Sequence, residues 1–254
     1  MDKFKLSNPL NAQKRLEDAV NALKELVKIK KSPEDLLSVK SSQFITLIIS
    51  LSKSPEFVKS KHLAIKIPNS IYRYPENEAC LFVKDPQRKW KELINSSNIE
   101  PKVISKIISV SKLSKKYSTY KDRRELCSGY DLFLSDDRII EKMPKLLGSF
   151  FIKTNKMPIA IKMRESNFKS SIESALSSTF MSIKKGKCIG VRVARVDMDT
   201  KQVVQNILET IKQVFDFFEG NSKNKNWKNN IESLYIQSTN TMSLPIWFRE
   251  NDKS

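Results

Sequence analysis

The sequence predicts an α/β protein with two domains, one of which is inserted into the other. Residues 76–157 alternate short apolar runs with helical segments, a pattern typical of a doubly wound, Rossmann-like parallel sheet. The residues on either side supply amphipathic helices and strand-like runs, and neither flank alone could bury a core. We therefore expect residues 1–75 and 158–254 to form one discontinuous α/β sandwich domain around the inserted domain 76–157.

The first flank predicts one helix and two strands. The helix begins at Pro9 after the capping residue Asn8. Its apolar residues recur on one face: Leu16, Ala19, Val20, Leu23 and Val27. The continuous apolar run 44–51 (FITLIISL) indicates a buried strand, and the alternating run 62–67 indicates a second one. Residues 68–77 contain prolines and asparagines, which favours a connection between the domains.

The inserted domain predicts buried strands at 79–85 and 130–134. A short helix and a strand are expected within 102–113. Asp136 and Asp137 follow the second apolar run and begin a helical segment. Pro144 lies inside that segment, so the helix should be short or kinked.

The second flank predicts helices at 167–178 and 201–218, and the latter has the clearest helical periodicity in the chain. Between them, residues 178–196 indicate two strands joined at Lys185–Gly186. A strand, a Ser/Thr-rich turn and a last strand follow within 231–248. These elements complete the predicted sandwich domain.

The chain is strongly basic. Its 254 residues include 46 Lys and Arg against 28 Asp and Glu, a formal charge of +18. Such a charge indicates a polyanionic partner, with nucleic acid the leading class and an anionic membrane surface the second. No apolar run approaches the ~18 residues of a membrane span, and the N-terminus does not look like a signal peptide. We expect a soluble intracellular monomer.

The composition argues against cofactor and metal chemistry. Cys80, Cys127 and Cys188 lie far apart, and with His62 they form no metal-ligand spacing. We expect these cysteines to be buried thiols in a reducing compartment. The chain has only five glycines and no phosphate-binding glycine loop, so no cofactor is expected.

Two pairs of acids could serve acid–base or metal chemistry: Asp136 with Asp137, and Asp197 with Asp199. Each pair also precedes a predicted helix, where carboxylates act as caps. No nucleophile or second ligand source accompanies either pair. The capping interpretation is favoured, and we predict no catalytic residue and no metal site.

Three sequence features could contact RNA. The first is the basic turn of Lys184, Lys185 and Lys187 with Arg192 and Arg195 on the adjoining strand, although an ordinary solvated hairpin explains it equally well. The second is the hydroxyl-rich turn after the last long strand, which could bind phosphates, sugars or base edges, or serve only as a turn. Its residues are Ser238, Thr239, Asn240, Thr241, Met242 and Ser243.

The third feature, Lys40 and Ser41 near the first predicted strand, depends on a family resemblance. Five stretches occur in the order typical of the ribosomal protein L1 family, which forms the mobile stalk of the large ribosomal subunit. They are CLFVKDPQ, YKDRRELCSGYDLFLSDDRIIEKMPKLLGSFF, KMPIAIK, GKCIGVRVARVDM and LYIQSTNTMSLPIW. The resemblance covers roughly residues 10–248 and implies the same two-domain layout, with no enzymatic activity. Asp131, Asp136 and Asp137 then look like framework residues of domain two.

The resemblance also implies where RNA binds. Family members bind RNA mainly with domain one, through a Ser/Thr-Thr-Met-Gly-Pro turn. The hydroxyl-rich turn matches this motif, but it is longer and has Ser243 in place of the glycine. Near the first strand the match is loose, at Lys40 and Ser41. These departures resemble the nucleolar ribosome-biogenesis paralogues.

The implied function is therefore non-catalytic binding of precursor ribosomal RNA, together with pre-ribosomal assembly proteins, in the nucleolus. The small-subunit (90S-type) precursor is slightly favoured. The alternatives are a factor of the large-subunit precursor (pre-60S), the large-subunit stalk protein itself, or a protein-interaction scaffold within pre-ribosomes.

Overall fold

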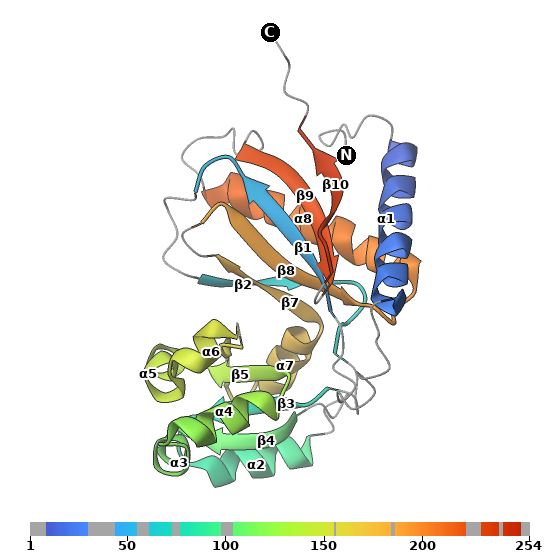
Figure 1. Ribbon diagram of the computed structural model, residues 1–254. Coiled ribbons are helices and arrows are strands. Elements are labelled where there is room, and N and C mark those ends of the chain that lie inside the picture. Colours follow the sequence, from blue (N-terminus) through green and yellow to red (C-terminus); the bar gives the residue numbers. More distant parts are fainter. Residues whose placement is uncertain are drawn as a thin grey trace. The chain divides into compact units, whose positions relative to one another are not determined.

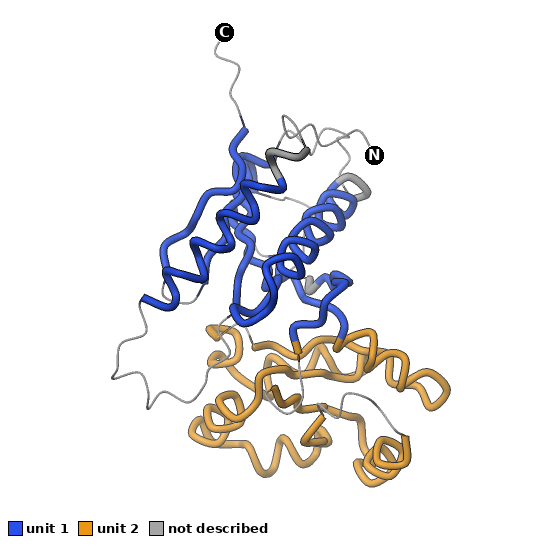
Figure 2. Tube along the Cα trace, turned by 90° about the vertical axis from the view of Figure 1, so that its right-hand side faces the viewer, with its two compact units in different colours: residues 1–71, 177–254 blue, residues 72–176 orange. Residues whose placement is uncertain are grey.

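A computed structural model describes residues 9–29, 44–54, 61–72, 77–97, 104–154, 156–183, 186–221, 230–238 and 241–249. The chain divides into two compact units (Figure 2). Unit 1 comprises residues 1–71 and 177–254, and unit 2 comprises residues 72–176. One unit is built on an antiparallel sheet and the other on a parallel sheet, so the predicted α/β fold class is confirmed.

Unit 1 is built from both ends of the chain (Figure 1). Its six-stranded sheet has the order β10-β9-β1-β8-β7-β2, and its paired strands are antiparallel. In chain order its elements are α1 (Pro9–Ile29), β1 (Phe44–Leu51), β2 (Lys61–Lys66), β7 (Ser178–Ile183), β8 (Cys188–Arg195), α8 (Thr200–Asn221), β9 (Ile231–Ser238) and β10 (Leu244–Phe248).

One hydrophobic core joins the sheet of unit 1 to helices α1 and α8. Alternate residues of β1 point into it: Ile45, Leu47, Ile49 and Leu51 are buried, while the residues between them are half-buried. The helices contribute one apolar face each, as the periodicity predicted. The buried residues from them include Leu16, Val20, Leu23, Val203, Ile207 and Val214. On the other face of the sheet, the side chains of β1 are partly exposed.

Unit 2 is a doubly wound parallel domain. Its four strands have the order β4-β3-β5-β6, and every neighbouring pair is parallel. In chain order its elements are β3 (Ala79–Val83), α2 (Gln87–Ser96), β4 (Ile104–Ser109), α3 (Val110–Lys116), α4 (Tyr120–Ser128), β5 (Leu132–Asp136), the 3-10 helix η2 (Ile140–Lys142), α5 (Met143–Leu147), α6 (Ser149–Lys153), β6 (Ile159–Ile161) and α7 (Phe168–Leu176).

Strand β3 is an unbroken apolar run, and all five of its residues are buried, because both faces of the sheet are covered there. Phe82 and Phe133 face the core that includes Leu126 of α4 and Phe151 of α6. Trp90 of α2 packs edge-to-face on Phe168 of α7 at 6.5 Å. The helices begin at the hydroxyl residues that favour N-caps: α3 at Ser109 and α4 at Thr119.

Three details differ from the sequence predictions. Unit 2 extends from 72 to 176, beyond the expected 76–157, because β6 pairs with β5 and α7 packs on α2. Residues 102–113 supply the strand β4 first and the helix α3 after it. Cys188 is exposed, whereas Cys80 and Cys127 are buried, so the prediction of buried thiols is wrong for Cys188.

Candidate nucleic-acid interface

One end of the unit 1 sheet gathers several of the side chains that the sequence singled out for RNA binding. Phe44 at the start of β1 lies opposite Arg195 at the end of β8. Ile45 lies opposite Ser238 at the end of β9. Since these neighbouring strands are antiparallel, the start of β1 and the ends of β8 and β9 coincide, and we call this region the sheet end.

Arg192 and Phe44 form a cation–π pair at the sheet end. The Arg192 guanidinium carbon lies 5.0 Å from the centroid of the Phe44 ring, and both side chains are half-buried. The register between β1 and β8 shifts between Ile45 and Thr46, which places Thr46 opposite Arg192. Such a pair holds the guanidinium flat while leaving its donors available to a ligand.

Arg195 is engaged within the protein. Its Nε and one terminal nitrogen donate to the two carboxylate oxygens of Asp197, at 2.9 and 2.8 Å. The Arg195 side chain is 8% exposed, whereas that of Asp197 is 48% exposed. This ion pair fixes the backbone that connects β8 to α8. Asp197 therefore holds an arginine in place, which gives this acid of the two-acid motif a structural role.

The hydroxyl-rich turn is closed by its own threonine. The buried Ser238 N–H donates to Thr241 Oγ1 at 2.9 Å, and the same hydroxyl donates to Ser238 C=O at 3.1 Å. Gln237 Nε2 donates to Thr241 C=O at 2.9 Å. Thr241 is 7% exposed, so its hydroxyl shapes the turn and does not face solvent.

Among the described residues of this turn, Met242 and Ser243 are exposed. Met242 is 61% exposed, which is unusual for a large apolar side chain, and Ser243 is also exposed. Ser238 Oγ is buried and has no hydrogen-bond partner among the described residues. Thr239 and Asn240 lie outside the described residues, as do Lys40 and Ser41.

Lys187 lies at the opposite end of the sheet. Its carbonyl accepts from the Leu51 N–H at 2.7 Å, next to the pairing of Ser50 with Cys188. It precedes Arg195 by eight positions, which is about 26 Å along an extended strand. Lys184 and Lys185 lie outside the described residues. Lys187 and the sheet end are thus in separate regions, which the sequence alone did not show.

Comparison with known proteins identifies the family. Residues 11–242 match the model of the Ribosomal protein L1p/L10e family. The chain belongs to this family. The resemblance noted in the sequence is thereby confirmed.

The relatives of this family member include both assembly proteins and ribosomal proteins. A Schizosaccharomyces pombe protein named for ribosome biogenesis is 29% identical over 180 residues, 70% of this chain and 47% of that protein. Mouse ribosomal L1 domain-containing protein 1 is 26% identical over 243 residues, 92% of this chain and 51% of that protein. The large ribosomal subunit protein uL1 of Oryza sativa subsp. japonica is 28% identical over 203 residues, 78% of this chain and 90% of that protein.

Two ribosome-biogenesis proteins of Schizosaccharomyces pombe and the mouse L1 domain protein match ahead of the uL1 proteins, and the Saccharomyces cerevisiae ribosome biogenesis protein UTP30, 26% identical over 247 residues, follows them. The chain spans about half the length of the first curated relatives that it matches, at 47%, 51% and 58%. Family membership therefore covers the L1 domain and leaves the rest of those longer proteins unmatched.

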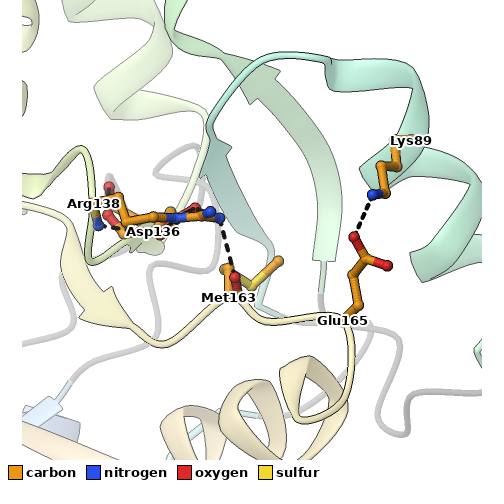
Figure 3. Close-up of polar contacts among 6 residues, drawn as sticks. Lys89, Asp136, Arg138, Met163 and Glu165 are labelled. Carbon is orange, nitrogen blue, oxygen red and sulfur yellow. Dashed lines mark hydrogen bonds and ion pairs between the residues drawn. The ribbon is translucent and has the colours of Figure 1, made fainter.

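In unit 2 of this L1 family member, the buried acid Asp136 forms an ion pair with Arg138. Asp136 is fully buried at the end of β5, where it accepts hydrogen bonds from Arg138 N, Nε and a terminal nitrogen. Burial would raise the pKa of Asp136, but the hydrogen bonds from Arg138 outweigh it and hold that pKa below its ordinary value. Arg138 also donates to Met163 C=O at 3.1 Å (Figure 3). A second ion pair, between Lys89 and Glu165, lies nearby.

The described residues contain neither a cluster of metal ligands nor a membrane-spanning helix. Within the described ranges, no group of three or more His, Cys, Asp or Glu side chains comes together as a metal site requires. Every helix in this part of the chain is too short or too polar to cross a membrane.

Sequence reasoning missed Phe44 as a member of the sheet end. Its partner Arg192 is 148 positions away, so no local spacing reveals the pair. The available sequence signal was the aromatic residue Phe44 at the start of the apolar run, because an aromatic ring at the end of a strand can stack on a base. The pairing of β1 with β8 was needed to use it.

Proposed function

We propose that this chain is a non-catalytic ribosome-biogenesis factor that binds precursor ribosomal RNA in nucleolar pre-ribosomal particles. One observation carries the proposal: the sheet end presents the Arg192–Phe44 pair together with the exposed turn of Met242 and Ser243. The charge of +18 supports a polyanionic ligand. Proteins named for ribosome biogenesis among the relatives support the cellular process.

The chemistry of the sheet end suits structured RNA. A guanidinium held on an aromatic ring can donate two hydrogen bonds to a phosphate or to a base edge. An exposed methionine offers a polarizable surface for a ribose or a base, and a serine hydroxyl can bond to a 2′-hydroxyl. None of these groups is a nucleophile paired with a base, so the sheet end binds without performing chemistry.

The host particle is proposed to be the small-subunit precursor. A large-subunit precursor, and the mature stalk of the large subunit, are the competing locations, and the match to uL1 of rice favours testing the latter directly. In each location the same sheet end would hold RNA, so the particle has to be read from the RNA itself.

The deciding experiment is in-cell crosslinking of the protein to RNA with sequencing of the bound fragments. Reads in small-subunit precursor RNA or transcribed spacers would support the proposal. Reads confined to the stalk helices of mature large-subunit RNA would replace it with the ribosomal role.

A second experiment tests the sheet end with purified RNA taken from the crosslinked region. Arg192→Ala should weaken binding about tenfold and make the salt dependence shallower, because one phosphate contact is lost. Lys212→Ala on α8 removes the same charge and serves as the matched control. Equal losses in both variants would show that general charge, and not the sheet end, holds the RNA.

A further inference from the structure

Strand β4 leaves one side of the unit 2 sheet open. It is the first strand in the order β4-β3-β5-β6, and within the described residues no strand pairs with its outer side (Figure 1). A cleft of about 310 Å³ lies there. It is lined by Lys91, Ile94, Asn95, Ile104, Ser105, Lys106, Ile107 and Lys112. These residues come from α2, β4 and the first turn of α3.

The cleft runs along the backbone of β4. It touches four consecutive residues, from Ile104 to Ile107. Successive side chains of a strand point to opposite faces of the sheet, so a space that borders all four must lie against the edge of the strand. Half of the N–H and C=O groups of an edge strand point outward, where they can pair with another chain.

The walls of the cleft are basic and partly apolar. No acidic residue lines it. Lys91 and Lys112 are exposed, and among the described residues neither forms an ion pair. The ammonium of Lys106 lies 5.7 and 5.6 Å from the ring centroids of Tyr117 and Tyr130, and its interaction with Tyr117 raises the pKa of Lys106. The cleft therefore attracts negative charge along one strand edge.

We propose that an extended acidic segment of a partner protein binds this edge, adding to β4 as a further strand with its carboxylates against Lys91 and Lys112. Strand addition uses the outward backbone groups for affinity and the alternating side chains for specificity. In β4 the Ile107 C=O already accepts a hydrogen bond from Gln87 Nε2 at 2.7 Å, so a partner strand would pair with the other outward groups or displace this amide. A peptide supplies N–H and C=O groups in the spacing that β4 requires, and RNA does not. Ile94 and Ile104 offer contacts to apolar residues of the peptide between its acids. The proposal concerns unit 2 and does not depend on RNA binding by unit 1.

The test uses the full chain and a short fluorescein-labelled peptide of alternating Asp and Val residues, followed by fluorescence anisotropy. Binding is expected, together with slower hydrogen exchange at residues 104–109. The same peptide with alternate amides N-methylated keeps its charge but cannot pair with a strand, so its binding should be at least about tenfold weaker.

Protein variants test the charge. Lys91→Glu with Lys112→Glu should weaken peptide binding about tenfold, since two attractions become repulsions. Lys115→Glu with Lys145→Glu makes the same change in net charge on exposed residues outside the cleft, and should change binding less than about twofold. Circular dichroism checks that each variant is folded, and the N-methylated peptide tests the idea without any protein variant.

Four results would overturn the proposal. The first is no binding of the acidic peptide, in which case the lysines serve only to keep the edge from aggregating. The second is equal binding of the N-methylated peptide, and the third is an equal loss in the control variant. The fourth is binding of an RNA oligonucleotide that depends on Lys91 and Lys112, with no binding of the peptide. That result would make the cleft an RNA site.

Discussion

Replacing Thr241 by valine should loosen the hydroxyl-rich turn at a predictable cost. The Thr241 hydroxyl accepts the Ser238 N–H at 2.9 Å and donates to Ser238 C=O, and both residues are buried. Valine has nearly the same shape but lacks the hydroxyl. The Ser238 C=O keeps the bond from the Thr241 N–H at 3.2 Å, whereas the Ser238 N–H loses this acceptor. An unsatisfied buried donor costs about 1–3 kcal/mol, so Thr241→Val should destabilise unit 1 by about 2 kcal/mol.

The matched control is Thr241→Ser, which keeps the hydroxyl and removes only a methyl group. It should cost less than about 1 kcal/mol. The assay is hydrogen exchange of the segment 231–248 at increasing urea, because it reports on this region separately from unit 2. A Thr241→Val protein as protected as the wild type would refute the reasoning. Equal losses in both variants would show that the methyl group and not the hydroxyl holds the turn.

Two further predictions concern unit 2 and the cysteines. Arg138 lowers the pKa of Asp136 in the folded state, so this carboxylate contributes stability above about pH 4 that is lost as the pH falls further. Asp136→Asn should destabilise unit 2 by about 1–3 kcal/mol at neutral pH and flatten its acid dependence, measured by urea denaturation at several pH values. Cys188 should react quickly with a thiol reagent in the folded protein, whereas Cys80 and Cys127 should react only on unfolding. Burial raises the pKa of Cys80 to about 12, and mass spectrometry of the labelled peptides would contradict this if Cys80 reacted first.

The fold class could be predicted because its signals are local. The helical periodicity of 201–218 and the strand–helix alternation of unit 2 both lie in short windows of sequence. The apolar run of β1 was harder, since Thr46 and Ile48 face away from the core although the run looks uniformly buried. The limit of unit 2 at 176 was missed because it depends on β6 pairing with β5, which no local pattern reports.

The candidate interface could be predicted only in part. The hydroxyl-rich turn was found through its residue types and its family resemblance. Which hydroxyls are used inside the turn could not be foreseen, because the Thr241 bonds depend on how the chain bends back to Ser238. Arg195 looked like a ligand-binding cation, yet Asp197 engages it two residues later. Lys187 directly precedes β8, whereas the sheet end contains the last residue of that strand, Arg195.

Unit 1 is built from segments on both sides of unit 2, and this sets the order in which the two units can fold during synthesis. Unit 2 is one continuous stretch, residues 72–176, and its strands pair with neighbours nearby in sequence. It can fold as soon as that stretch has left the ribosome. Strand β1 is made early but pairs with β8 and β9, which follow unit 2 in the chain. The proposed RNA-binding end therefore assembles only after β9 has been made, so a nascent chain that reaches only residue 176 would carry a folded unit 2 without the sheet end.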